Sequence, residues 1–237
     1  MRDVTVVIPC YNENNEAVIK TCSELQSMGM NVIVVDDGGT MDLPNTIKTI
    51  RYTPNMGYGY ALKQGIKAAD TEFIITMDGD SQHLPKDAWK IYTVFKLIDD
   101  CTMVVGSRWN LKEIWYRWFF RKVINFIASC WANHYMQDLN SGMRMFRRKI
   151  VLDYQDILCD TFSFTTSLTM SIVTDGYKIS YFPINVQPRA YGKSRVKLIR
   201  DGVITIWYIF YIGFALRTRK IRKIVRTYFS FFHNNGA

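Results

Sequence analysis

The sequence predicts an α/β fold in which a doubly wound, mostly parallel sheet occupies roughly the first 108 residues. Short apolar runs, each about as long as a buried strand, alternate there with segments whose apolar residues recur at helical spacing. Several of these runs end at polar turns, which is typical of strands in an open parallel sheet. Strands that alternate with helices join through right-handed crossovers, so the pattern favours parallel pairing.

Residues 4–9 start the pattern with an apolar run that ends at Pro9. After a polar loop, apolar side chains recur at helical spacing over residues 15–28, and Gly29 marks the end of that helix. Residues 31–35 are a second apolar run, which two aspartates and two glycines follow. These segments predict a first β-α-β unit.

The alternation continues with a weaker strand at 46–52 and a helix over residues 55–69 that a glycine-containing turn opens. Free N–H groups at a helix start favour anions, so this turn indicates either phosphate contact or close packing of the helix. A strand at 73–77, a helix at 85–98 and a short strand at 103–106 complete this part of the chain.

Residues 111–135 differ in character, because Trp and Phe side chains alternate there with Arg and Lys. Such a pattern suits amphipathic helices that lie at a membrane interface. The alternative is a helix packed on the sheet. Further on we expect a strand at 143–146, a helix at 164–174 and a strand at 179–186. A basic loop at 189–195 follows, which either closes over phosphates or is simply solvated.

The last part of the chain joins an apolar stretch to a basic one. Residues 202–216 carry no charge, and as a helix they would measure about 22 Å, short of the roughly 30 Å hydrocarbon core of a bilayer. Residues 217–226 are strongly basic. We therefore expect a helical tail at 201–237 that lies in the interface of an anionic leaflet, with a single membrane span as the alternative.

Charge and cysteine content limit the possible partners. The net charge is +9, and residues 187–237 hold 11 of the 30 Lys and Arg residues but one acidic residue. This tail suggests an anionic partner, lipid headgroups or nucleic acid, and the neighbouring aromatic residues favour lipid. Five scattered cysteines without CxxC spacing and three histidines argue against a disulfide framework or a zinc site. We expect a reducing compartment and no secretory signal.

Two carboxylates follow the strand at 73–77, at the edge of a sheet where ligands bind. Asp78 and Asp80 have only Gly79 between them, and Gln82 can add a carbonyl oxygen. Oxygen ligands suit Mg²⁺ or Mn²⁺, which often bridge to substrate phosphates. The turn is therefore either a metal site or a solvated acidic turn.

Seven motifs in a fixed order carry a resemblance to a known family. They are VIPCYNE (7–13), VDDG (35–38), NMGYG (55–59), DGDSQH (78–83), GSR (106–108), the segment 138–147 and RAYGKS (189–194). With them the chain resembles family 2 glycosyltransferases of GT-A fold, and more narrowly the dolichol-phosphate mannose synthase and polyprenyl-phosphate glycosyltransferase group. The resemblance implies a Rossmann-like sheet in a catalytic domain at 1–200, with interface helices at 111–135.

The resemblance also implies roles for single residues. The base and ribose of a nucleotide sugar would contact Pro9, Tyr11, Glu13, Val35 and Asp37. Its diphosphate would contact Asp78, Gly79 and Asp80, together with Arg189 and Lys193 from the basic loop. The ligands of the Mg²⁺ or Mn²⁺ ion would be Asp78, Asp80 and Gln82. An acceptor phosphate would contact Arg108, Arg121 and Asn125, the last at a position where a Ser is frequent. The residues assigned to catalysis are Asp80, Arg108 and Arg189.

The activity implied is the inverting, metal-dependent transfer of a hexose from a GDP-mannose or UDP-glucose type of donor to a polyprenyl or dolichyl phosphate. The place implied is the cytoplasmic face of a membrane, with peripheral or monotopic attachment and no nucleic acid partner. Two alternatives stay open: transfer to a glycan or protein, and a non-catalytic module that binds nucleotide sugar or nucleic acid. The sequence leaves the sugar, the prenol length and the oligomeric state open.

Overall fold

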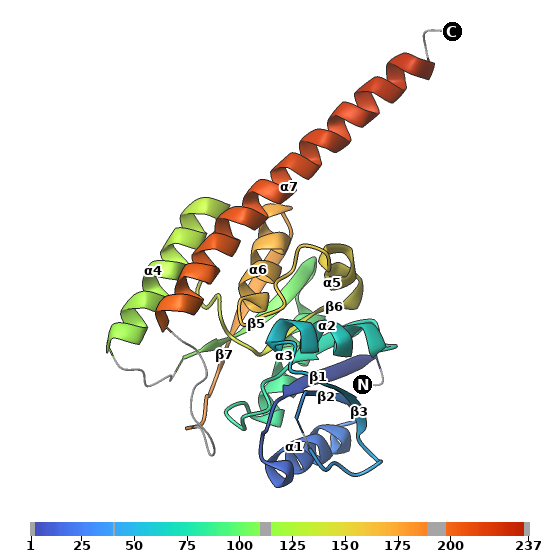
Figure 1. Cartoon of the computed structure of the whole chain (residues 1–237), viewed down its shortest axis with the longest axis vertical. Helices are drawn as coiled ribbons and strands as arrows, with labels where there is room; N and C mark the ends of the chain where they lie inside the picture. Colours follow the sequence, from blue (N-terminus) through green and yellow to red (C-terminus); the bar gives the residue numbers. More distant parts are fainter. Residues whose placement is uncertain (1–2, 40, 110–114, 189–197, 235–237) are drawn as a thin grey trace.

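The computed structural model describes residues 3–39, 41–109, 115–188 and 198–234, and it shows a seven-stranded sheet flanked by helices (Figure 1). The strands are β1 (Val4–Cys10), β2 (Asn31–Asp37), β3 (Lys48–Tyr52), β4 (Phe73–Thr76), β5 (Cys101–Arg108), β6 (Arg144–Arg147) and β7 (Lys178–Ile184). The helices are α1 (Asn15–Ser27), α2 (Tyr58–Ala68), α3 (Pro85–Leu97), α4 (Trp115–Ala132), α5 (Arg148–Tyr154), α6 (Phe164–Thr174) and α7 (Leu198–Asn234).

The strands of the sheet lie in the order β3-β2-β1-β4-β6-β5-β7. All neighbouring pairs are parallel except those of β6, which runs antiparallel between β4 and β5. This arrangement confirms the predicted fold class, a mostly parallel sheet flanked by helices. The prediction that the sheet belongs to the first 108 residues was too narrow, because β6 is inserted into the sheet and β7 extends it beyond β5.

Apolar layers cover both faces of the sheet, which explains why its strands are continuous apolar runs rather than alternating ones. All seven residues of β1 are buried. Val6 belongs to the layer that α1 and α3 cover, and Val7 to the layer that α2 and α6 cover. Helix α2 lies so close to the sheet that a Cβ atom on Gly65 would stand 2.3 Å from Val7 Cγ1. A glycine at this point therefore sets the distance between α2 and β1.

Helix α7 is the largest departure from the expected elements. Where the sequence predicted an apolar helix at 202–216 and a separate basic helix after it, the structure has one helix of 37 residues. The polarity changes near Arg217 without a Gly or Pro, so nothing in the backbone ends the helix there. Among the described residues, no helix combines the length and the apolar character that a membrane crossing requires.

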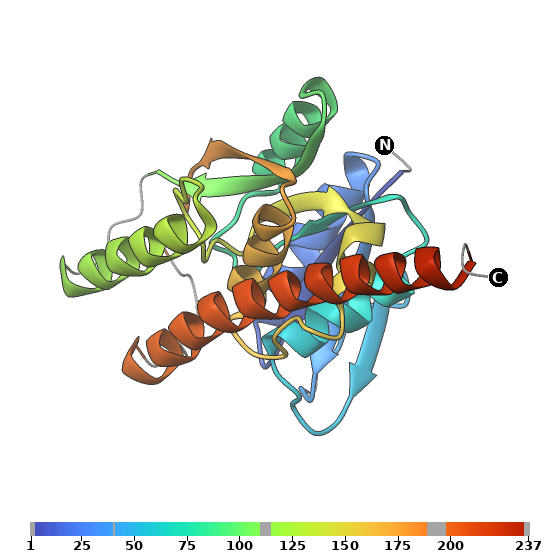
Figure 2. The same cartoon turned by 90° about the horizontal axis from the view of Figure 1, so that it is seen from above.

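Helices α4, α6 and α7 pack side by side on one face of the sheet, and α7 continues past the body of the molecule (Figures 1 and 2). The contact between α4 and α7 is close at Gly213, where a Cβ atom would stand 1.9 Å from Trp131 Nε1. The guanidinium carbon of Arg217 lies 4.7 Å from the centre of the Trp131 ring system. The Phe210 ring meets the same tryptophan with centroids 4.8 Å apart.

The sides of α4 and α7 that face away from this packing are aromatic. On α4 four of the exposed aromatic side chains recur at helical spacing: Trp115, Trp118, Phe119 and Phe126. On α7 exposed apolar side chains do so at Val203, Trp207, Tyr211 and Phe214. We call these two rows the aromatic stripes. They belong to helices whose other side chains, such as Ala128 and Ile212, are buried, so each helix both packs on the body and presents an apolar row outward.

Candidate active site

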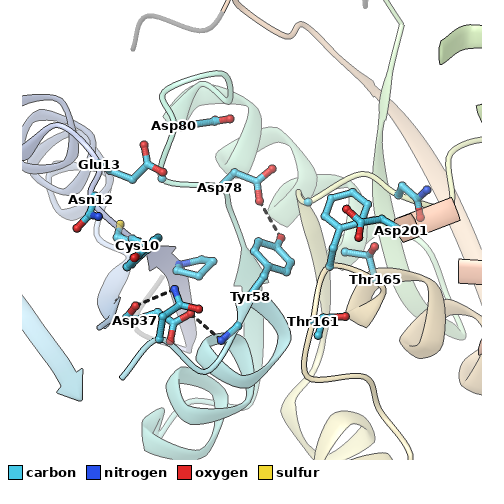
Figure 3. A pocket seen from close by; sticks show the side chains of 18 of the residues that line it. Cys10, Asn12, Glu13, Asp37, Tyr58, Asp78, Asp80, Thr161, Thr165 and Asp201 are labelled. Atoms are coloured by element: carbon cyan, nitrogen blue, oxygen red, sulfur yellow. Dashed lines mark hydrogen bonds between the residues drawn. The ribbon is translucent and has the colours of Figure 1, made fainter. Parts of the chain in front are cut away.

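A pocket of about 660 Å³ opens at the carboxyl ends of β1, β2 and β4 (Figure 3). Its lining comes from the loop after β1, the end of β2, the start of α2 and the acidic turn after β4. The opposite wall comes from the segment before β6, the start of α6 and the start of α7. The pocket therefore lies at the edge where ligands bind in open α/β sheets.

The Asp78 carboxylate is held from two sides. The Tyr58 hydroxyl donates a hydrogen bond of 2.7 Å to Asp78 Oδ1, and His83 Nδ1 accepts the N–H of Asp78 at 3.4 Å. Burial and the negative charge of Asp78 raise the pKa of Tyr58 well above its ordinary value, so the hydroxyl keeps its proton and remains a donor. Gly142 approaches so closely that a Cβ atom there would stand 2.3 Å from either carboxylate oxygen. The orientation of the Asp78 carboxylate thus depends on Tyr58 and Gly142, two residues distant in sequence.

Gln82 connects the acidic turn to the segment that follows β7. The Gln82 N–H donates to Asp80 Oδ1 at 3.1 Å. The Gln82 side-chain amide donates to the carbonyl of Gln187 at 3.2 Å, and the Gln187 N–H returns a bond of 2.9 Å to the Gln82 carbonyl. These contacts direct the side-chain N–H of Gln82 toward the segment that precedes residue 189.

Divalent metal chemistry fits the donor set of this turn. Within the described ranges, no group of three or more His, Cys, Asp and Glu side chains could hold a metal ion. Two carboxylates, Asp78 and Asp80, line the same pocket. Mg²⁺ is often bound by one or two carboxylates together with substrate phosphates, so these two residues suit an ion that the substrate helps to bind.

Asp37 organises the turn in front of α2. Its carboxylate accepts hydrogen bonds from the N–H groups of Met56 (2.7 Å) and Gly57 (2.9 Å), and Asn55 donates to its carbonyl at 3.0 Å. Cβ atoms on Gly57 and Gly59 would stand 2.7 and 2.2 Å from the carbonyl oxygens of residues 160 and 159. The glycines of this turn are therefore needed for close packing, which is one of the two roles the sequence left open.

The structure brings most of the predicted donor residues together and separates one. The pocket lining includes Pro9, Tyr11, Glu13, Asp37, Asp78, Gly79 and Asp80. The side chain of Val35 lies instead in the core with no exposed surface, so it is separated from the pocket that the other residues line. Arg189 and Lys193 lie outside the described residues.

The three residues assigned to the acceptor phosphate gather at a second place, around the loop at 137–139. Arg108 forms a paired contact with the buried Asp138, through Nε to Oδ2 (2.9 Å) and a terminal nitrogen to Oδ1 (2.8 Å). Asn125 donates to the carbonyl of Gln137 at 2.8 Å and accepts from the Leu139 N–H at 3.4 Å. In this structure both side chains support the loop.

Charges around Asp138 outweigh its burial. Burial alone would raise the pKa of this carboxyl group, but the Arg108 charge, its hydrogen bonds and the Arg121 charge together hold the pKa below its ordinary value. Arg121 therefore acts on the same carboxylate as Arg108. The cluster of Arg108, Arg121 and Asp138 is a cationic site with a carboxylate built into it.

Arg144 supports the pocket wall from inside the core. This fully buried side chain donates to the carbonyls of Leu139, Ser141 and Thr165 and to the Thr169 hydroxyl. Burial lowers the pKa of its guanidinium to about 10, which leaves it charged at neutral pH. Arg144 thereby ties the segment before β6 to α6, and both of these elements line the pocket.

The sequence did not single out several pocket residues. Tyr58, Gly142, Thr165 and Asp201 all line the pocket. Gly142, Thr165 and Asp201 reach it through tertiary contacts rather than through a strand-end pattern. Tyr58 lies in the NMGYG motif and His83 in the acidic motif. Both motifs follow a predicted strand, and this position could have identified the two residues from the sequence.

Replacing Gly142 by Ala is expected to lower activity strongly with a smaller effect on folding. The new methyl group would displace the Asp78 carboxylate, because the site has no room for a Cβ atom. A roughly tenfold or larger loss of turnover is expected, since small misplacements at reacting centres are costly. Steady-state kinetics and thermal unfolding measure the two effects. Gly202→Ala is the matched control, because nothing lies within 4 Å of its new Cβ atom.

Comparison with known proteins identifies relatives of the chain. Residues 5–154 match the model of a family described as Glycosyl transferase family 2. The chain is 30% identical over 211 residues to an uncharacterized protein of Methanocaldococcus jannaschii, which covers 81% of this chain and 85% of that protein. It is 26% identical over 215 residues to an undecaprenyl-phosphate 4-deoxy-4-formamido-L-arabinose transferase of Proteus mirabilis. That match covers 83% of this chain and 64% of the transferase, so the chain spans just under two thirds of this relative's length.

Solved structures share the fold. A glucosyl-3-phosphoglycerate synthase from Mycobacterium tuberculosis, in complex with Mn²⁺, uridine diphosphate and phosphoglyceric acid, superposes with a TM-score of 0.71 at 13% identity. The match covers 90% of this chain and 78% of that one. A complex of the same enzyme with Mg²⁺ and uridine diphosphate gives a TM-score of 0.67 at 14% identity, over 90% and 79% of the two chains. At this identity the likeness shows the fold alone.

Proposed function

Since the chain belongs to glycosyl transferase family 2, we propose that it transfers a hexose from a nucleotide sugar to a polyprenyl phosphate, with inversion at the anomeric carbon. The observation that carries this proposal is the pocket at the strand ends. It places the carboxylates of Asp78 and Asp80 beside Asp37 and Glu13 in one cavity large enough for a nucleotide sugar.

The donor would lie along this pocket. We assign the base and ribose to the side formed by Tyr11, Glu13 and Asp37, and the diphosphate to Asp78 and Asp80, which would hold Mg²⁺ or Mn²⁺. When bound, such an ion neutralises the charge that develops on the leaving diphosphate. The Mn²⁺ and Mg²⁺ complexes of the structural neighbour support this choice of metals.

The acceptor would approach from the side of Arg108 and Arg121. The name of the Proteus mirabilis relative, an undecaprenyl-phosphate transferase, supports a polyprenyl phosphate in this role. Arginine suits paired contact with a phosphate, and the Arg108–Asp138 contact already fixes the guanidinium in one orientation. Arg189 and Lys193 remain assigned to the donor diphosphate by the motif alone.

The chemistry requires no strong general base. A lipid monophosphate is already an anionic nucleophile, so one of its oxygens attacks the anomeric carbon directly. The bond from that carbon to the diphosphate oxygen breaks, and the nucleoside diphosphate leaves with the bonding electrons. In-line attack inverts the anomeric centre. The cationic side chains offset the repulsion between the two anions.

Acceptor competition separates this proposal from transfer to a glycan or protein. The purified chain with Mn²⁺ would receive labelled UDP-glucose or GDP-mannose, together with undecaprenyl phosphate and an excess of oligosaccharide acceptors. The proposal expects label in the lipid fraction, unaffected by the oligosaccharides. Label in the oligosaccharides, or donor binding without any transfer, would contradict it.

Attachment to a membrane is the second part of the proposal, and the aromatic stripes support it. On α4, the Lys122 ammonium lies 6.0 Å from the centre of the exposed Trp118 ring system, a combination that suits headgroup depth. We propose that the stripes lie against the cytoplasmic leaflet, where the lipid acceptor would be available. The basic residues of the tail would add attraction to anionic lipids.

A double charge substitution in the α4 stripe tests this attachment. Trp118→Glu with Phe126→Glu is expected to weaken binding to anionic vesicles by roughly tenfold or more, because two apolar side chains would no longer enter the interface. Vesicle sedimentation measures the binding. The matched control is Trp89→Glu with Leu97→Glu on α3, whose exposed side chains belong to the opposite layer. Equal binding by both double variants would contradict the proposed orientation.

A further inference from the structure

We propose that the start of α7 completes the pocket with a subsite for the hydroxyl groups of the transferred sugar, formed by Asp201 and Thr165. The inference rests on the proposed function and names the residues that would form hydrogen bonds with the transferred sugar. Both residues lie beyond residue 154, where the match to the family ends. The subsite is therefore formed by elements outside the part of the chain that matches the family model.

Asp201 lies on the wall opposite the predicted nucleotide side. In Figure 3, Asp37 and Glu13 are on one side of the pocket, Asp78 and Tyr58 are in the middle, and Asp201 and Thr165 are on the other side. A nucleotide sugar has the same linear order of base with ribose, diphosphate and sugar. With the diphosphate at the acidic turn, the sugar extends toward Asp201.

Hydrogen bonds fix Asp201 relative to α6. The Ser163 and Thr205 hydroxyls lie 3.0 Å apart, and the Thr205 hydroxyl donates to the carbonyl of Asp201 at 2.7 Å. All three residues are buried, which makes the loss of such contacts costly. The first turns of α7 are thus attached to the residue that precedes α6. Rigid placement of this kind is what a specificity residue needs.

Thr165 offers a hydroxyl group whose hydrogen-bonding capacity is not used within the described protein. Its Oγ1 atom is buried and has no hydrogen-bond partner, and the residue is 3% exposed and lines the pocket. An unsatisfied buried hydroxyl costs about 1–3 kcal/mol. A ligand hydroxyl that enters the pocket would remove this cost, so Thr165 is an independent sign of a polar ligand at this wall.

The chemistry of the subsite favours sugar hydroxyls over phosphate. The Asp201 carboxylate accepts hydrogen bonds from hydroxyl groups but repels phosphate oxygens. Arg200 Nε lies 3.0 Å from Asp201 Oδ1 and lines the same pocket, so its charge is paired with the carboxylate, which it orients. Phe162 also lines the pocket, 6.4 Å from the Tyr58 ring, and gives the wall an apolar surface beside the polar groups. Sugar rings present this same combination of hydroxyl edges and apolar faces.

Binding measurements with and without the sugar test the subsite. Calorimetric titrations with Mn²⁺ would compare UDP with UDP-glucose and GDP with GDP-mannose on the complete chain. Asp201→Asn is expected to weaken binding of the preferred nucleotide sugar by roughly tenfold or more, since a charged hydrogen bond is lost. Binding of the matching nucleoside diphosphate is expected to change by less than about twofold. Thr165→Val is expected to show the same selective loss at a smaller size, although it removes an unsatisfied hydroxyl and keeps the volume.

The control makes the same chemical change elsewhere. Asp70→Asn replaces an exposed carboxylate outside the pocket and is expected to leave both affinities unchanged. If Asp201→Asn and Thr165→Val bind the nucleotide sugar as tightly as the unaltered chain, the subsite is wrong and the proposed function stands. If the unaltered chain binds nucleoside diphosphates and nucleotide sugars equally, the subsite is also wrong. If it binds neither, the proposed function fails and the subsite with it.

Discussion

Asp80→Asn is expected to lower the rate of sugar transfer by at least about 100-fold at saturating donor. The reason is the loss of one of two carboxylates that line the pocket after β4. Charge stabilisation by a bound divalent ion contributes several kcal/mol at the transition state, and each 1.36 kcal/mol is a factor of ten in rate. Transfer assays at increasing Mn²⁺ concentration measure the effect, and excess metal is expected to restore part of the rate.

The matched control for this loss is Asp42→Asn, which removes an exposed carboxylate outside the pocket. Circular dichroism and thermal unfolding of Asp80→Asn are expected to resemble those of the unaltered chain, because Asp80 is only partly buried. A variant that keeps the full rate and the same metal dependence would show that Asp80 has no role in catalysis. If Asp80→Asn does not fold, the transfer rate and metal dependence of Asp80→Glu, which keeps the charge, would be measured instead.

Asp138→Ala is expected to cost about 3 kcal/mol of the free energy of unfolding. The substitution removes the carboxylate that faces Arg108 and leaves a guanidinium whose side chain is only 20% exposed without its main partner. Breaking a buried ion pair from one side costs about 3–5 kcal/mol, and the partial exposure of Arg108 favours the lower end. Urea unfolding measures the change. Lys178→Ala is the control, because its pair with Asp100 is exposed and is worth about 1 kcal/mol or less.

A double substitution and the pH dependence of unfolding are two further tests of the Arg108–Asp138 pair. Arg108→Leu with Asp138→Leu is expected to cost less than Asp138→Ala alone, since no charge remains unpaired. The pKa of Asp138 is lower in the folded than in the unfolded chain. Its contribution is therefore complete above the unfolded pKa, near 4, and is lost as the pH falls through the lower folded value. An acid unfolding curve of Asp138→Asn that matches the unaltered chain would contradict this role.

The strands were predictable because the sheet is covered on both faces. A strand that is buried on both faces needs apolar residues on both sides. Such strands among β1 to β5 therefore appear in the sequence as continuous apolar runs. Strand β6 gave a weaker signal. It has four residues with an arginine at each end. Arg144 lies in the core only because the carbonyls of Leu139, Ser141 and Thr165 accept hydrogen bonds from its guanidinium. Partners that are brought together by folding leave no spacing pattern.

The helices were harder to delimit. Helix α5 begins with Arg148 and Lys149 and was missed, since its short apolar side, with Val151 and Tyr154 buried, has too few turns for periodicity. The two expected C-terminal helices are one, because a change of polarity does not break the backbone. Sequence patterns report which side of a segment is apolar. They do not report where a helix continues into a different environment.

The pocket residues also separate into those that the sequence predicted and those that it did not. Residues that directly follow β1, β2 and β4, such as Glu13, Asp37 and Asp78, were found, because the carboxyl ends of parallel strands meet at one edge. Gly142, Thr165 and Asp201 come from later segments and reach the pocket only through the packing of β6, α6 and α7. In the sequence, Asp201 follows a basic segment (189–195) and precedes an uncharged stretch (202–216). The composition on either side therefore does not single out this carboxylate.

The most direct test of the account is the identification of the product by mass spectrometry. The purified chain would be incubated with undecaprenyl phosphate, Mn²⁺ and either UDP-glucose or GDP-mannose, and the lipid fraction analysed. The expected product is a polyprenyl monophosphate that carries one hexose, formed only when metal, donor and lipid phosphate are all present and not formed by Asp80→Asn. A diphosphate-linked product, or unchanged lipid beside a donor that binds normally, would contradict the claim that the lipid phosphate attacks the anomeric carbon.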